Sequence, residues 1–184
     1  MWRYLPNAIS LARGAATFPV VWLILDGRWR WAFWVALLAG LSDLVDGWLA
    51  KRFHWQTRLG AGLDGLADKL LLFGVFLALV LIGRLPVWWL ILALARDLVI
   101  VVGAWFYNRL IEKLRPQPSW LGKASTAAQI ALALLIIANS AWQLQLPELE
   151  SIMFWLAVGL TSLSGIHYII IWARRAYRRS GARP

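Results

Sequence analysis

Long apolar runs separated by short polar segments occupy almost the whole chain. Six of the runs are about as long as a bilayer-spanning helix, which needs about 20 apolar residues. They cover residues 8–25, 31–50, 60–82, 87–107, 124–142 and 152–172. The pattern predicts an all-α integral membrane protein with six transmembrane helices, and we expect residues 1–184 to form a single membrane domain.

The composition favours the same interpretation. Hydrophobic residues make up 61% of the chain and the mean hydropathy is +0.64, whereas soluble domains are roughly 45–50% apolar. Many of the 14 tryptophans fall near the ends of the apolar runs, and indole rings favour the membrane–water boundary. The absence of cysteine excludes disulfide and thiolate chemistry.

The distribution of basic residues predicts the orientation. If the N-terminus is inside, only Arg28, Arg30 and Arg84 lie in outer loops, and most of the 19 lysines and arginines lie inside. This bias places both termini in the cytoplasm. The net charge of +10 therefore indicates contact with anionic membrane lipid and not with nucleic acid. The segment MWRYLPNAIS is predicted to form a short interfacial helix before the first span.

Acidic residues gather where the second predicted span ends and the third begins. Asp43 and Asp46 are spaced i, i+3, and Asp64 and Asp68 are spaced i, i+4, so each pair shares a helix face. Because the loop between the two helices is short, the helices are antiparallel neighbours. The four carboxylates are therefore expected to converge just below the cytoplasmic surface.

Convergent carboxylates repel one another and lose hydration, and bound divalent cations would offset both costs. Oxygen ligands suit Mg²⁺ or Mn²⁺, and two such ions can hold a diphosphate during displacement at phosphorus. Gly47 and Gly60 would let a bulky ligand approach the backbone. For either acid pair alone, an ion pair with Lys69 or Arg96, or a role in an ion pathway, is the alternative.

The same residues resemble the motif of the CDP-alcohol phosphotransferases, D-x-x-D-G-x-x-A-R followed after about eight residues by G-x-x-x-D-x-x-x-D. Here it stands as DLVDGWLAK, RFHWQTRL and GAGLDGLAD. Every acid and glycine of the motif is present at its spacing, and Lys51 replaces the motif arginine. Lysine keeps the charge but loses the bidentate geometry. The resemblance extends over the whole chain, since the family core has six helices and a short N-terminal surface helix.

The resemblance implies transfer of a phosphatidyl group from CDP-diacylglycerol to an alcohol, with release of CMP and two Mg²⁺ or Mn²⁺ ions as cofactors. By carry-over, Asp43, Asp46 and Asp64 would bind the metals, and Asp68 would complete the second metal site and act as the base. The residues expected to line the CMP portion are Gly47, Ala50, Lys51 and Gly60. The resemblance also implies a homodimer in a bacterial inner membrane, with the active site facing the cytoplasm.

Arg96 and Lys123 bear on the acceptor. A charge inside a span, such as Arg96, is a functional candidate, and both residues resemble positions that bind the acceptor phosphate in relatives that use phosphorylated alcohols. The alternatives are an ion pair of Arg96 with Asp97 or with a motif acid, and a role for Lys123 as a topology anchor. A phosphate-bearing acceptor is therefore expected in place of serine or choline.

Two branches of the family fit the chain. PSWLGK and LADK look like phosphatidylglycerophosphate synthases, whose acceptor is sn-glycerol 3-phosphate. LPNAISLARG, LAGLSDLVDG and Asp97 after Arg96 look like cardiolipin synthases, whose acceptor is phosphatidylglycerol. The glycerol 3-phosphate branch is the leading hypothesis, because it is the commoner bacterial activity at this length.

Two other classes of protein fit less well. Membrane prenyltransferases carry two aspartate motifs far apart in sequence, whereas both acid pairs here lie close together. A non-enzymatic transporter would have acids nearer mid-membrane and polar residues along several spans. Release of CMP from CDP-diacylglycerol by the purified protein would separate the enzyme from the transporter.

Overall fold

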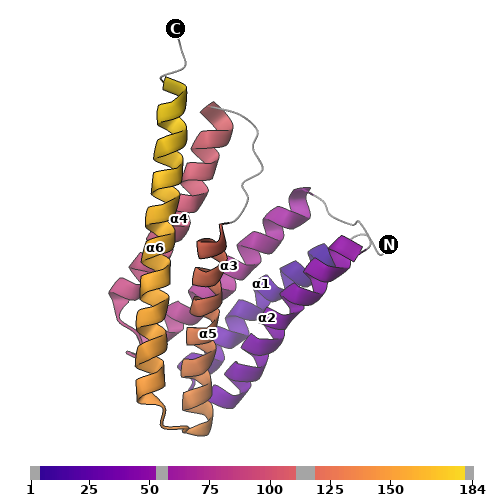
Figure 1. The fold of residues 1–184 in the computed structure, drawn as a ribbon. Helices are drawn as coiled ribbons and strands as arrows, with labels where there is room; N and C mark the ends of the chain where they lie inside the picture. Colours follow the sequence, from indigo (N-terminus) through magenta and orange to yellow (C-terminus); the bar gives the residue numbers. More distant parts are fainter. Residues whose placement is uncertain (1–4, 53–57, 111–118, 181–184) are drawn as a thin grey trace. The chain divides into compact units, whose positions relative to one another are not determined.

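The computed structural model describes residues 5–52, 58–110 and 119–180, and within them the side chains of 11–42, 52, 65–103 and 119–172. These described residues form six α-helices and no strand (Figure 1). The helices are α1 (Leu5–Leu25), α2 (Trp29–Arg52), α3 (Arg58–Leu81), α4 (Val87–Leu110), α5 (Trp120–Trp142) and α6 (Pro147–Ser180). Each contains most of one predicted apolar run, so the all-helical prediction is confirmed.

The helices differ from the predicted runs mainly at the two ends of the chain. Residues 5–10 form the first turns of α1 and not a separate helix, and residues 1–4 lie outside the described part. At the other end, α6 begins five residues before the predicted run and continues to Ser180. Glu148 and Glu150 lie in its first turn, where the helix dipole stabilises negative charge. Helix α6 is longer than the apolar run 152–172 because the polar residues before and after that run are also helical.

Two helices end in the same way, at glycines in the left-handed conformation. Gly27 has a φ of 73° and Gly83 a φ of 74°. After α1, the N–H of Arg28 donates to the carbonyl of Leu23 at 2.9 Å; after α3, the N–H of Arg84 donates to that of Leu79 at 2.8 Å. These are Schellman ends, which satisfy the last carbonyls of a helix and need a residue without a Cβ.

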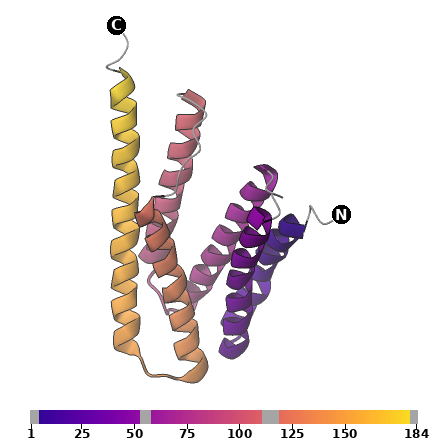
Figure 2. The ribbon, with the colours of Figure 1, turned by 45° about the vertical axis from the view of Figure 1, so that its right-hand side comes forward.

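Residues 1–86 and Ala133–Leu146 form one compact unit, in which α1 packs against α2 and α3 (Figures 1 and 2). Its core includes Val20, Ile24, Phe76 and Leu79. Gly74 of α3 lies so close to Thr17 of α1 that an added Cβ would collide with the threonine methyl group. The small residue therefore sets how closely α1 and α3 approach.

Val87–Leu132 and residues 147–184 form a second unit, in which α4 packs against α6 and the first part of α5 is included. Gly103 of α4 lies directly against the indole ring of Trp172 on α6. Polar side chains also join α5 to α6, because Ser125 and Gln129 hydrogen-bond to Thr161 at 3.1 and 3.0 Å. All three are buried, which fits helices that associate through hydrogen bonds as well as packing.

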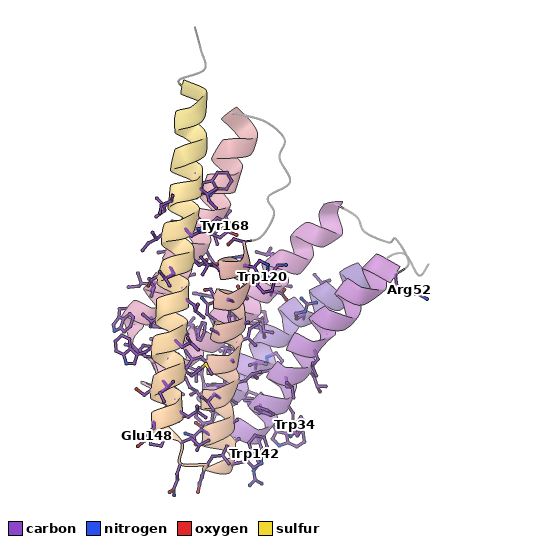
Figure 3. The ribbon with its side chains drawn as sticks, viewed as in Figure 1. Trp34, Arg52, Trp120, Trp142, Glu148 and Tyr168 are labelled. Carbon is purple, nitrogen blue, oxygen red and sulfur yellow. The ribbon has the colours of Figure 1, made fainter. Side chains whose placement is uncertain are left out.

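Aromatic side chains mark one end of each unit. In the first unit, Phe33 and Trp142 meet edge to face with ring centroids 4.9 Å apart, and Figure 3 shows Trp34 and Trp142 near the same helix ends. In the second unit, the ring centroid of Phe154 lies 5.4 Å from that of Trp88 and 5.6 Å from that of Trp89. On the predicted topology these are the outer ends of the helices, where such rings favour the interface.

Two of the described helical segments, Trp120–Trp142 and Pro147–Trp172, are long and apolar enough to cross a membrane. A shorter apolar segment covers Leu11–Leu25. Large apolar side chains are also exposed along several helices, among them Phe18, Trp31, Leu98 and Ile152. Side chains of this kind are stable on a helix surface that faces lipid.

Candidate active site

The acidic motif lies at the facing ends of α2 and α3. Asp43 and Asp46 fall in the last turns of α2, and Asp64 falls near the start of α3. Both stretches are uninterrupted helix, so the i, i+3 and i, i+4 spacings place each pair on one side of its helix. Their side chains, with those of Gly47, Ala50, Lys51 and Gly60, lie outside the described part, and the roles expected of them stay predictions.

Asp68 is the motif acid whose side chain is described, and it forms an ion pair with Arg13 of α1. The Asp68 side chain remains 44% exposed, whereas that of Arg13 is completely buried. Arg13 also donates from Nε to the Oγ of Ser42 on α2 at 3.3 Å. The guanidinium therefore joins α1, α2 and α3 beside the acidic motif.

Small residues let Arg13 reach Asp68. Gly14 of α1 lies against Ala67 of α3, where an added Cβ would sit 3.7 Å from the alanine Cβ. Each of these residues is the sequence neighbour of one member of the ion pair. Close approach of the two backbones brings the guanidinium within contact distance of the carboxylate. Sequence reasoning did not assign Arg13, although its position inside an apolar run was the available signal.

Arg96 is buried in the second unit and is held by three segments. It donates to Asp97 Oδ1 at 2.7 Å, to the Gly122 carbonyl at 3.0 Å and to Ser164 Oγ at 3.2 Å. The pair with Asp97 is one of the alternatives that the sequence left open. The other two bonds tie α4 to the start of α5 and to α6.

Lys123 lies one residue after Gly122 and is exposed, in the first turn of α5. Ser119 caps this helix, because its Oγ accepts a hydrogen bond from the Gly122 N–H at 3.0 Å. The N–H of Ser119 in turn donates to the hydroxyl of Tyr168 at 3.1 Å (Figure 3 labels Tyr168). The turn that carries Lys123 is thus fixed by α6 on one side and by Arg96 on the other.

The described side chains contain no group of three or more His, Cys, Asp or Glu that could hold a metal ion. Asp43, Asp46 and Asp64 are not among these side chains. The chemistry of the motif donors does fit a hard divalent cation, since four carboxylates on two neighbouring helix ends supply only oxygen ligands. The Asp68 side chain, which is 44% exposed, is the described member of this donor set.

Comparison with known proteins agrees with the motif. The family model described as CDP-alcohol phosphatidyltransferase matches residues 3–163. A cardiolipin synthase (CMP-forming) from Streptomyces coelicolor is 33% identical over 178 residues, which cover 90% of this chain and 81% of that protein. The chain spans about half the length of the animal cardiolipin synthases it matches, for example 54% of the one from Drosophila melanogaster and 50% of the human protein.

Relatives with another name match to a similar degree. A CDP-diacylglycerol–glycerol-3-phosphate 3-phosphatidyltransferase from Bacillus subtilis is 31% identical, with 89% of this chain and 92% of that protein covered. One from Salmonella choleraesuis is 32% identical, with 90% and 92% covered. The extent of these matches and the family model together show that the chain belongs to the CDP-alcohol phosphatidyltransferase family.

Proposed function

We propose that the protein transfers the phosphatidyl group of CDP-diacylglycerol to a phosphate-bearing alcohol, with sn-glycerol 3-phosphate as the leading acceptor. The acceptor hydroxyl oxygen would form a new bond to the phosphorus of the phosphatidyl group, and the bond from that phosphorus to CMP would break. The observation that carries the proposal is the complete set of motif acids and glycines on α2 and α3 in a chain of this family.

Members of the family generally use divalent metals. We propose that Asp43, Asp46 and Asp64 hold two Mg²⁺ or Mn²⁺ ions and that Asp68 completes the second site. When bound, the ions would offset the negative charge of the diphosphate and of the leaving CMP. The CMP portion would lie against Gly47, Ala50, Lys51 and Gly60, where the small residues leave room and the lysine supplies charge.

Asp68 is also the proposed general base. A base must reach the proton that it removes, and this carboxylate is partly exposed and oriented by Arg13. It would accept the proton of the acceptor hydroxyl as the new oxygen–phosphorus bond forms. Positioning of the two substrates would supply much of the remaining rate enhancement.

Arg96 and Lys123 are the proposed contacts for the acceptor phosphate. Lys123 is exposed and can meet an anion directly, whereas Arg96 would approach one only from its buried position beside Gly122. We expect Lys123→Ala to raise the KM for the acceptor about tenfold, as loss of a charge-assisted hydrogen bond does, with kcat little changed. Steady-state kinetics with varied acceptor would measure this, and Arg84→Ala, in the loop between α3 and α4, is the matched control. An unchanged acceptor KM would remove Lys123 from the site.

The leading acceptor is favoured by the extent of two of the matches. This chain covers 92% of the glycerol-3-phosphate enzymes from Bacillus subtilis and Salmonella choleraesuis and 74% of the one from Aquifex aeolicus, compared with 81% of the Streptomyces cardiolipin synthase and 54% of the Drosophila one. The alternative acceptor, phosphatidylglycerol, is favoured by the sequence Arg96–Asp97 and by the 33% identity to the Streptomyces protein. The two acceptors differ in that the first is a soluble phosphate monoester and the second a lipid phosphodiester.

Thin-layer chromatography of the products tests the acceptor. Purified protein would be given CDP-diacylglycerol with either glycerol 3-phosphate or phosphatidylglycerol. We expect a phosphatidylglycerophosphate spot and CMP in the first reaction. Product formed only from phosphatidylglycerol would assign the chain to the cardiolipin branch, and absence of CMP release with every acceptor would favour a non-enzymatic transporter.

We further propose a single membrane domain with six spans, an interfacial N-terminal segment, both termini in the cytoplasm and a homodimeric assembly in a bacterial inner membrane. The positive-inside distribution of charge and the two clearly membrane-length helical segments support this arrangement. Because the chain has no cysteine, single cysteines can report the topology. An impermeant maleimide should label Glu148→Cys from outside intact cells but label Arg178→Cys only after permeabilisation.

A further inference from the structure

Arg13 is a buried charge next to the proposed metal site, and its surroundings are specific. The side chain is fully buried on α1, with an ion pair to Asp68 of α3 and a hydrogen bond to Ser42 of α2. Ser42 is the residue before the first motif acid, and it donates to the Ala39 carbonyl of its own helix at 2.7 Å. Arg13 therefore connects Asp68 of the motif on α3 to α2 at the residue before the first motif acid.

A buried arginine is stable only when it is paired, and removal of one partner leaves an uncompensated charge. The fold provides for this pairing, since Gly14 and Ala67 let α1 and α3 approach closely beside the ion pair. The exposed share of Asp68 differs from the complete burial of Arg13. The arginine is thus the buried member of the pair, and the carboxylate is the member with exposed surface.

We propose that Arg13 is a positioning residue that supplies the resident positive charge of the acidic site. It orients the Asp68 carboxylate and offsets part of the repulsion among the motif acids while no divalent cation is bound. This inference rests on the proposed function, because it takes the four carboxylates as one metal site. It predicts that a divalent cation can replace the electrostatic contribution of Arg13.

Thermal unfolding of detergent-purified protein, with EDTA or with Mn²⁺, tests whether a divalent cation can replace the charge of Arg13. We expect Arg13→Gln to lower Tm in EDTA by about 5–10 °C, the shift that loss of a buried ionic partner produces in a chain of this length. Added Mn²⁺ should recover most of that loss, so the Mn²⁺-induced rise in Tm should exceed that of the wild type. The Tm of Arg13→Lys in EDTA should lie between those of the wild type and Arg13→Gln, because lysine keeps the charge.

Arg96→Gln is the matched control, because it removes another buried guanidinium whose ion pair is with Asp97 and not with a motif acid. It should lower Tm without a larger response to Mn²⁺ than the wild type shows. Equal Mn²⁺ responses of Arg13→Gln and the wild type would overturn the inference, as would an equally large response of Arg96→Gln.

Two further outcomes separate this inference from the proposed function. If Mn²⁺ raises the Tm of the wild type and of Arg13→Gln by the same amount, the proposed role of Arg13 is wrong but the metal site stands. If Mn²⁺ changes neither Tm, the metal site itself fails, and the inference with it. If Arg13→Gln does not fold, the double variant Arg13→Gln/Asp68→Asn, which removes both charges of the pair, takes its place. We expect the double variant to fold and to be purified in EDTA. If it does not fold even with Mn²⁺ present, the proposal is contradicted.

Discussion

Asp68→Asn is expected to abolish turnover while the protein still binds CDP-diacylglycerol. Asparagine has nearly the same shape as aspartate but cannot accept the proton of the acceptor hydroxyl. Loss of a general base reduces kcat by about 10²–10⁴-fold. The metal ions held by the other motif acids would still bind the diphosphate end of the donor, so the donor Kd should change much less than kcat.

Two measurements check this expectation. CMP release with saturating substrates gives kcat, and equilibrium binding of labelled CDP-diacylglycerol gives the donor affinity. Asp26→Asn is the control, since Asp26 lies in the loop after α1 and pairs there with Arg28 at 2.6 Å. Turnover within a factor of two of the wild type would refute the assignment of Asp68 as base.

Asp68→Asn should also reduce stability, and the cause would be Arg13. The substitution removes one carboxylate partner from the completely buried guanidinium, and loss of a partner of a buried charge is costly. The loss of kcat can still be attributed to chemistry if kcat is measured well below the Tm of the variant. Arg13→Lys alters the ion pair but leaves the Asp68 carboxylate in place. Comparison of its kcat and Tm with those of Asp68→Asn therefore separates the loss of the base from the loss of stability.

The sequence was sufficient to predict the helices because their signal is local. Each apolar run was long enough to identify a helix, and the glycines after α1 and α3 mark two of the ends. The length of α6 was underestimated, since the polar residues before and after its apolar run also adopt helix. The segment MWRYLPNAIS was predicted to form a separate interfacial helix, whereas its described residues, 5–10, are the first turns of α1.

The sequence allowed predictions about the candidate site only where the residues are close in sequence. The spacing of the motif acids places them on α2 and α3, their roles stay predictions, and the Arg96–Asp97 pair was foreseen as an alternative because the two residues are adjacent. The pairing of Arg13 with Asp68 depends on how α1 packs against α3, over a separation of 55 residues. Nothing in a local pattern specifies that contact, and the Gly14–Ala67 approach that permits it becomes visible only in three dimensions.

Removal of divalent metal is expected to stop CMP release completely, and Mg²⁺ or Mn²⁺ should restore it. Without a cation, the carboxylates of α2 and α3 would repel the diphosphate of the donor. Metal ions supply several kcal/mol of stabilisation in such displacements, which corresponds to roughly 10³-fold or more in rate. Activity after dialysis against EDTA, followed by titration with each metal, measures the dependence.

Asp46→Asn should reveal the same site from the protein side, because a neutral amide is a weaker ligand for a hard cation than a carboxylate. We expect the variant to need a much higher metal concentration for half-maximal activity and to have a reduced kcat at saturation. Glu148→Gln, at the start of α6, removes an acid outside the motif and should leave the titration unchanged (Figure 3). On the proposal above, Arg13 offsets part of the negative charge near Asp68, so the metal-free protein should remain folded. The activity should therefore change with metal concentration, whereas the folded fraction should not. Full activity in EDTA, or an Asp46→Asn titration that coincides with that of the wild type, would show that these acids serve something other than metal binding.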